Sequence, residues 1–108
     1  MQVPHKHSYN RESVDAFRVN DIYAPEGQRA GAFWYQAASF DGAIRGVIVR
    51  LPGAGLMLCN LDPSRGRCWT RSGSDEQPTL EPEIHAKPHQ LRQFGWRGHL
   101  RCGRFESI

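Results

Sequence analysis

The fold class that the sequence predicts is mainly β. We expect a small single domain, an antiparallel meander of about five to seven short strands with a short N-terminal helix or coil. Three observations predict it. The apolar runs are short and rich in β-branched and aromatic residues, which strands favour. Eleven glycines and seven prolines are spread along the chain, so most runs end at a turn signal. The chain has 108 residues, which suits one domain with one core.

The first strands follow one another at turn signals. Asp41-Gly42, the dipeptide most typical of a tight hairpin, separates the first two runs. Glycine and proline turns at 52–55 and 62–66 separate the next ones. In order, the four expected strands are Ala32–Phe40, Ile44–Leu51, Leu56–Leu61 and Arg67–Arg71. We expect these four strands to form one antiparallel meander.

The second half of the chain predicts further extended segments. A polar loop leads into Thr79–Ile84, which is extended because each proline keeps the residue before it out of the helical region. Residues 85–93 are expected to form a loop or a single helical turn. Gly95–Leu100 and Arg104–Ile108 flank a glycine-containing turn, which predicts a closing hairpin.

Residues 1–28 form a polar segment ahead of a β domain that comprises residues 29–108. At most one short helix is expected in this segment, because Val14 and Phe17 lie at helical spacing and polar residues before them could cap it. So short a helix needs the rest of the domain to hold it.

Signals that would direct the chain to a membrane are not evident in the sequence. The longest apolar run, from Gly46 to Cys59, is interrupted by Arg50 and Pro52, whereas a membrane span needs about 18–20 apolar residues. The N-terminal residues lack the apolar core of a secretory signal. Three cysteines at wide spacing fit a reduced protein better than a disulfide framework. We therefore expect a cytoplasmic protein that does not contact a membrane.

Metal ligands and catalytic motifs are weakly represented. Zinc needs about four ligands, usually as two close pairs, and the chain has no C-x2-C pair. Strands could still bring together Cys59, Cys68, His99 and Cys102. Cysteines as small core hydrophobes are the favoured interpretation, and we expect no cofactor. Nucleophile elbows and phosphate-binding loops are also missing from the sequence, so we expect that the protein is not an enzyme.

A basic and aromatic stretch near the C-terminus is the strongest candidate for a binding surface. Arginines contact phosphates and aromatic rings stack on bases, a combination that single-strand binders use. The alternative is an amphipathic hairpin, in which Trp96 and Leu100 face the core while Arg97 and Arg101 face solvent. The net charge of +3 is compatible with nucleic acid but does not require it. The candidate binding residues are Arg92, Phe94, Arg97, Arg101 and Arg104.

Four fragments between residues 44 and 108 carry a resemblance to a known family. They are Leu51–Gly55, Arg67–Gly73, Pro78–Ile84 and Trp96–Arg104. In their order and spacing they resemble a group of small uncharacterised bacteriophage and prophage proteins, some mislabelled as ammonia monooxygenase. That family has a zinc-knuckle-like C-P-G-C-G at the first fragment and P-T-x-x-P-S-I at the third. Here Leu51 and Ala54 replace the two knuckle cysteines, so the metal site that the resemblance implies is lost.

The resemblance implies a phage origin and expression in a bacterial host, with no established reaction. We expect an accessory protein that binds a host or phage protein through an exposed arginine and aromatic surface. The contact surface should include Arg97, Arg101 and Arg104, while the three tryptophans, Trp34, Trp69 and Trp96, should be buried. The first alternative is a nucleic-acid-binding module derived from a zinc-ribbon-like ancestor, and the second is a metal-dependent enzyme.

Overall fold

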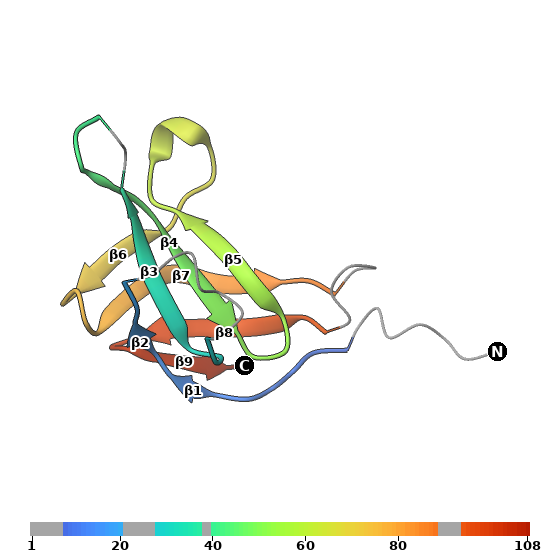
Figure 1. Cartoon of the computed structure of the whole chain (residues 1–108). Helices are drawn as coiled ribbons and strands as arrows, with labels where there is room; N and C mark the ends of the chain where they lie inside the picture. Colours follow the sequence, from blue (N-terminus) through green and yellow to red (C-terminus); the bar gives the residue numbers. More distant parts are fainter. Residues whose placement is uncertain (1–7, 21–27, 38–39, 89–93) are drawn as a thin grey trace.

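The computed structural model describes residues 8–20, 28–37, 40–88 and 94–108, and it confirms the mainly β prediction (Figure 1). Within these residues the only helix is the short 3-10 helix η2 (Pro63–Arg65). The strands are β1 (Val14–Asp15), β2 (Phe17–Arg18), β3 (Ala32–Ala37), β4 (Ile44–Leu51), β5 (Gly55–Asn60), β6 (Thr70–Gly73), β7 (Pro78–Ala86), β8 (Trp96–Arg101) and β9 (Arg104–Ser107). Apart from the two-residue strands β1 and β2, their number agrees with the expected five to seven. No helix in the described ranges is long and apolar enough to cross a membrane.

The strands form two sheets with the orders β1-β9-β8-β7-β6 and β2-β3-β4-β5. Figure 1 shows the strands of the four-stranded sheet crossing over those of the five-stranded sheet. One meander, β3-β4-β5, lies in the four-stranded sheet. A second meander, β6-β7-β8-β9, lies in the five-stranded sheet. The expectation that the strand after residue 66 continues the first meander is therefore wrong.

The chain leaves the first meander at the turn that follows β5. Asp62 caps η2, where its Oδ1 accepts hydrogen bonds from the backbone N–H and the hydroxyl of Ser64 at 3.0 and 2.7 Å. After this capped turn the chain pairs with β7 and not with β5. One backbone bond remains between the two segments, from the Trp69 N–H to the Asn60 carbonyl at 2.8 Å.

The N-terminal segment corrects a second expectation, because residues 14–18 are extended and not helical. Val14 pairs with Phe105 at the edge of the five-stranded sheet, and Phe17 pairs in parallel with Ala32 at the edge of the four-stranded sheet. The spacing of Val14 and Phe17 also suits a strand that changes sheets between them. Backbone bonds to both sheets stabilise the extended form more than an isolated two-turn helix could stabilise itself.

The core lies between the two sheets and contains side chains from both. The three tryptophans are buried, as predicted, with exposed fractions of 4% for Trp34, 9% for Trp69 and 0% for Trp96. Trp96 is the centre of the five-stranded half, since its ring meets the Phe105 ring edge-on at 6.0 Å between centroids. Its indole N–H donates to the Glu12 carbonyl at 2.9 Å, which ties the N-terminal segment to the core.

Candidate functional site

The predicted binding arginines lie on the outer face of the five-stranded sheet. Along β8, Trp96 and Leu100 point into the core while Arg97 and Arg101 point to solvent, as the alternation of the sequence predicts. Arg104 on β9 stands opposite Arg101, so the three guanidinium groups share one face. Two further predicted residues lie near β8 in the sequence. Phe94 is 40% exposed just before the strand, and Arg92 lies outside the described residues.

The charges on this face are largely compensated. Arg97 forms an ion pair with Glu83 at 2.8 Å, and Arg104 forms one with Asp15 at 2.7 Å. Among the described residues Arg101 has no acidic partner. The hydrogen bond from Arg97 lowers the pKa of the Glu83 carboxyl, and the Arg97 charge and the two nearby histidines add to the effect. The face is therefore a mixture of both charges and not a uniformly basic patch.

Two aromatic side chains of the basic and aromatic stretch point away from this face. Trp96 and Phe105 are fully buried in the core, so their rings are not available to stack on nucleic-acid bases. The amphipathic-hairpin interpretation of this stretch accounts for both side chains.

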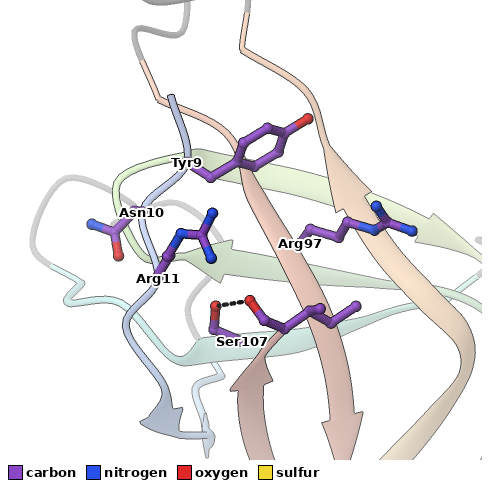
Figure 2. Close-up of a pocket in the computed structure, with 6 residues that line it drawn as sticks. Tyr9, Asn10, Arg11, Arg97 and Ser107 are labelled. Carbon is purple, nitrogen blue, oxygen red and sulfur yellow. Dashed lines mark hydrogen bonds between the residues drawn. The ribbon is translucent and has the colours of Figure 1, made fainter. Parts of the chain in front are cut away.

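A hollow of about 200 Å³ lies at one end of this face, between the segment around Tyr9 and strands β8 and β9 (Figure 2). The segment is held there by hydrogen bonds from the Asn10 N–H to the Gly95 carbonyl and from the Gly95 N–H to the Ser8 carbonyl. Figure 2 shows that the Arg97 guanidinium points away from Arg11, so Arg11 supplies the only positive charge directed into the hollow from the described residues.

Tyr9 and His85 fix the side of this hollow that faces β7. The Tyr9 hydroxyl and His85 Nε2 share a hydrogen bond of 2.7 Å, and the two rings are tilted against each other. Burial lowers the pKa of His85, and the charges of Arg97 and Lys87 lower it further. Burial therefore favours the neutral imidazole, and the pair anchors the N-terminal segment to the sheet.

The Glu83–Arg97 pair predicts a pH dependence. A carboxyl whose folded pKa is lowered contributes stability above its unfolded pKa, and this contribution is lost as the pH falls through the folded pKa. Glu83→Gln removes the titrating group, so we expect the melting temperature of the variant to fall less than that of the wild type between about pH 7 and 3. Thermal unfolding followed by circular dichroism at a series of pH values measures both slopes. Glu81→Gln, at an exposed position on the same strand, is the matched control and should keep the wild-type slope.

The four candidate metal ligands are not brought together. Cys59 is buried in the core, His99 points outward from β8, Cys102 is exposed in the β8–β9 turn, and Cys68 is half-buried before β6. Across the residues that the structure describes, no group of three or more His, Cys, Asp or Glu side chains could hold a metal ion. Burial raises the pKa of the Cys59 thiol to about 12, which makes this cysteine unsuitable as a nucleophile.

Similarity to known proteins does not indicate a functional site in this chain. Comparisons with protein-family models, curated proteins and solved structures find no match. The side chains of the chain itself are therefore the basis for assigning a site.

Sequence reasoning missed a second surface, on the outer face of the four-stranded sheet. We call it the apolar face and define it as Ile44, Ile48, Leu56 and Leu58 of strands β4 and β5. Ile48 stands opposite Leu58 in the β4–β5 register, and Leu56 follows on the same side of β5. Ile44, Leu56 and Leu58 are 42%, 38% and 50% exposed, and Leu56 and Leu58 are neighbours on one side of β5, with Arg50 of β4 opposite Leu56.

A signal for the apolar face is present in the sequence. Leu56, Met57, Leu58 and Cys59 are consecutive apolar residues, and a strand that buries one side must leave alternate members of such a run on the other. Met57 and Cys59 pack toward the core, so the two leucines face outward. The position of β5 at the edge of its sheet leaves these two leucines exposed, whereas Trp34, on the same face of β3 opposite Ile48, is 4% exposed.

Proposed function

We propose that this protein is a non-enzymatic binding module whose partner is another protein, bound through the apolar face. The observation that supports the proposal is the grouping of large exposed aliphatic side chains on two neighbouring strands. Contiguous exposed apolar side chains are typical of protein–protein contact sites, because their burial on association is favourable. The resemblance to bacteriophage proteins makes a host or phage protein the expected partner.

The outer face of the five-stranded sheet, with its paired charges, fits a protein partner better than a nucleic acid. Nucleic-acid binding draws most of its affinity from uncompensated basic groups, whereas Arg97 and Arg104 are paired with carboxylates. Trp96 and Phe105 of the same stretch are buried in the core, which leaves Phe94, 40% exposed, as its phenyl ring accessible for stacking on a base. The arginine face can contribute a polar rim to a protein complex, since rims of such interfaces are polar and exposed.

The test begins with capture of partners by the tagged full chain from a nuclease-treated bacterial lysate. A captured protein is then purified and titrated against the chain by calorimetry. The variant with Ile44→Glu and Leu58→Glu is expected to bind it at least about 10-fold more weakly, because two charges would be desolvated in the contact. Both side chains are about half exposed, so the variant should remain folded by circular dichroism.

The matched control changes the arginines on the outer face of the five-stranded sheet and leaves the apolar face intact. In it Arg97, Arg101 and Arg104 are all replaced by glutamine, and we expect binding to change by less than about 10-fold. Loss of binding in the arginine variant with binding kept in the apolar-face variant would overturn the assignment of the surface. Recovery of nucleic acid alone, from lysate without nuclease, would replace the protein partner by the nucleic-acid alternative.

A further inference from the structure

Strand β5 is an edge of the four-stranded sheet, and its far side carries backbone groups that the register identifies. The Leu61 N–H donates to the Arg45 carbonyl at 2.9 Å, which makes Arg45 and Leu61 a hydrogen-bonded pair. In an antiparallel ladder such pairs alternate, so Met57 and Cys59 also direct their N–H and C=O groups to β4. The N–H and C=O groups of Leu56 and Leu58 therefore point away from β4, to the open edge.

The open edge has a defined length. Beyond Leu58, the Asn60 carbonyl accepts the Trp69 N–H, so this end of the edge is occupied. Among the described residues no strand pairs with the outer side of β5, and neither Leu56 nor Leu58 has another hydrogen-bond partner. Two N–H donors and two C=O acceptors are thus directed outward in a row.

This edge lacks the features by which edge strands avoid pairing with another chain. Between Gly53 and Leu61 the sequence has no charged residue and no proline. The β4–β5 register continues without a bulge from Gly46 opposite Asn60 to Leu51 opposite Gly55. Pairing with another strand satisfies the backbone groups and buries the exposed leucines beside it.

We infer that β5 pairs antiparallel with β5 of a second copy of this chain, about a two-fold axis at Met57. In this register Leu56 stands opposite Leu58 of the partner subunit, and Leu58 stands opposite Leu56 of the partner subunit. Each of the two pairs exchanges both of its outward N–H and C=O groups, and the Asn60 carbonyl keeps its bond to Trp69. The two four-stranded sheets become one continuous sheet, with the apolar faces of both copies on the same side.

The distribution of charge fits a second copy. The arginines near β5 that follow it in the chain, Arg65 and Arg67, lie past the Asn60 end. In the antiparallel arrangement that end lies beside the uncharged turn at residues 52–55 of the partner subunit. The two sets of arginines are then separated by about the length of the six-residue strand, roughly 20 Å, at which salt screens their repulsion. On the outer face leucine meets leucine, so the contact is complementary to itself.

Analytical ultracentrifugation of the full chain over a wide concentration range tests the inference. The wild type is expected to form dimers. The variant with Leu56→Lys and Leu58→Lys, and separately the variant with Leu56→Glu and Leu58→Glu, should dimerise at least about 10-fold more weakly because like charges oppose each other across the two-fold axis. An equimolar mixture of the two variants should form a heterodimer, since each introduced lysine then faces a glutamate.

The matched control carries Thr70→Lys and Ser72→Lys on β6, which is the edge of the other sheet and exposes both side chains. This variant should dimerise like the wild type. A wild type that stays monomeric at all concentrations, a mixture that does not associate, or loss of the dimer in the β6 variant would each overturn the inference.

Two further readouts keep the test decisive if a lysine or glutamate variant does not fold. In the wild type, amide hydrogen exchange at Leu56 and Leu58 should slow as concentration rises, whereas Met57 should be protected by β4 at every concentration. Ile44→Glu alone should leave the dimer intact, because Ile44 lies outside the paired residues. Failure of the dimer is therefore distinguishable from failure of the proposed protein partner, which the Ile44 substitution should weaken.

Discussion

Trp96→Ala is expected to lower the free energy of unfolding by about 3–5 kcal/mol, the usual cost of deleting a large buried aromatic side chain. The ring has no exposed surface and contacts Phe105 edge-on in the centre of the core. Its N–H bond to the Glu12 carbonyl is also lost, so the N-terminal segment loses one of its attachments. A domain is typically stable by about 5–15 kcal/mol, so a large share of the stability would disappear. Urea unfolding followed by tryptophan fluorescence and circular dichroism measures the change.

Trp96→Phe separates the two contributions of this residue. A phenylalanine keeps an aromatic ring against Phe105 but cannot donate to Glu12, so the loss should be clearly smaller than for alanine. A change below about 1 kcal/mol in the alanine variant would mean that the core does not depend on this ring as the packing indicates.

The strands that the sequence predicts well are those bounded by unambiguous turns. Asp41-Gly42 lies in the connection between β3 and β4, and the glycine-containing turn before Arg104 joins β8 to β9, as expected. The alternation of Trp96, Arg97 and Leu100 was sufficient to predict which side chains face the core. Local patterns of this kind report the secondary structure and the buried face of a strand directly.

The partition of the strands into two sheets could not be predicted in the same way. A turn such as Asp62–Gly66 is compatible with a hairpin or with a crossover, and the choice depends on a capping contact and on distant partners. Val14 and Phe17 likewise fit both a short helix and a strand, and their partners Phe105 and Ala32 are decided by tertiary structure.

The candidate site shows the same division between local and distant information. The alternation of the sequence predicts that Arg97 and Arg104 are exposed, but it does not predict that their charges are paired with carboxylates. The partner of Arg104 is Asp15, 89 residues away in the sequence, and Arg97 is neutralised by Glu83 from the neighbouring strand. The apolar face required the knowledge that β5 ends a sheet, which its own residues do not state.

Gly98→Ala is expected to destabilise the fold by at least about 3 kcal/mol, the upper end of the usual cost of overpacking. Gly98 is buried in the middle of β8, between Arg97 and His99. A Cβ atom built there would lie 2.1 Å from the Glu106 carbonyl oxygen on β9 and 2.6 Å from the ring of Trp96. The first neighbour is backbone and the second is a rigid ring in the packed core, so neither can move aside without separating β8 from β9 or displacing Trp96.

Gly42→Ala is the control that separates crowding from the general effect of replacing a glycine. Gly42 has a φ of +73° in the β3–β4 connection, and a Cβ atom built there meets nothing within 4 Å. Its replacement should cost only the backbone strain of a left-handed residue, about 1–2 kcal/mol. Chemical unfolding of both variants gives the comparison. If Gly98→Ala were no more destabilising than Gly42→Ala, the close approach of β8 and β9 at this position would not be a requirement of the fold.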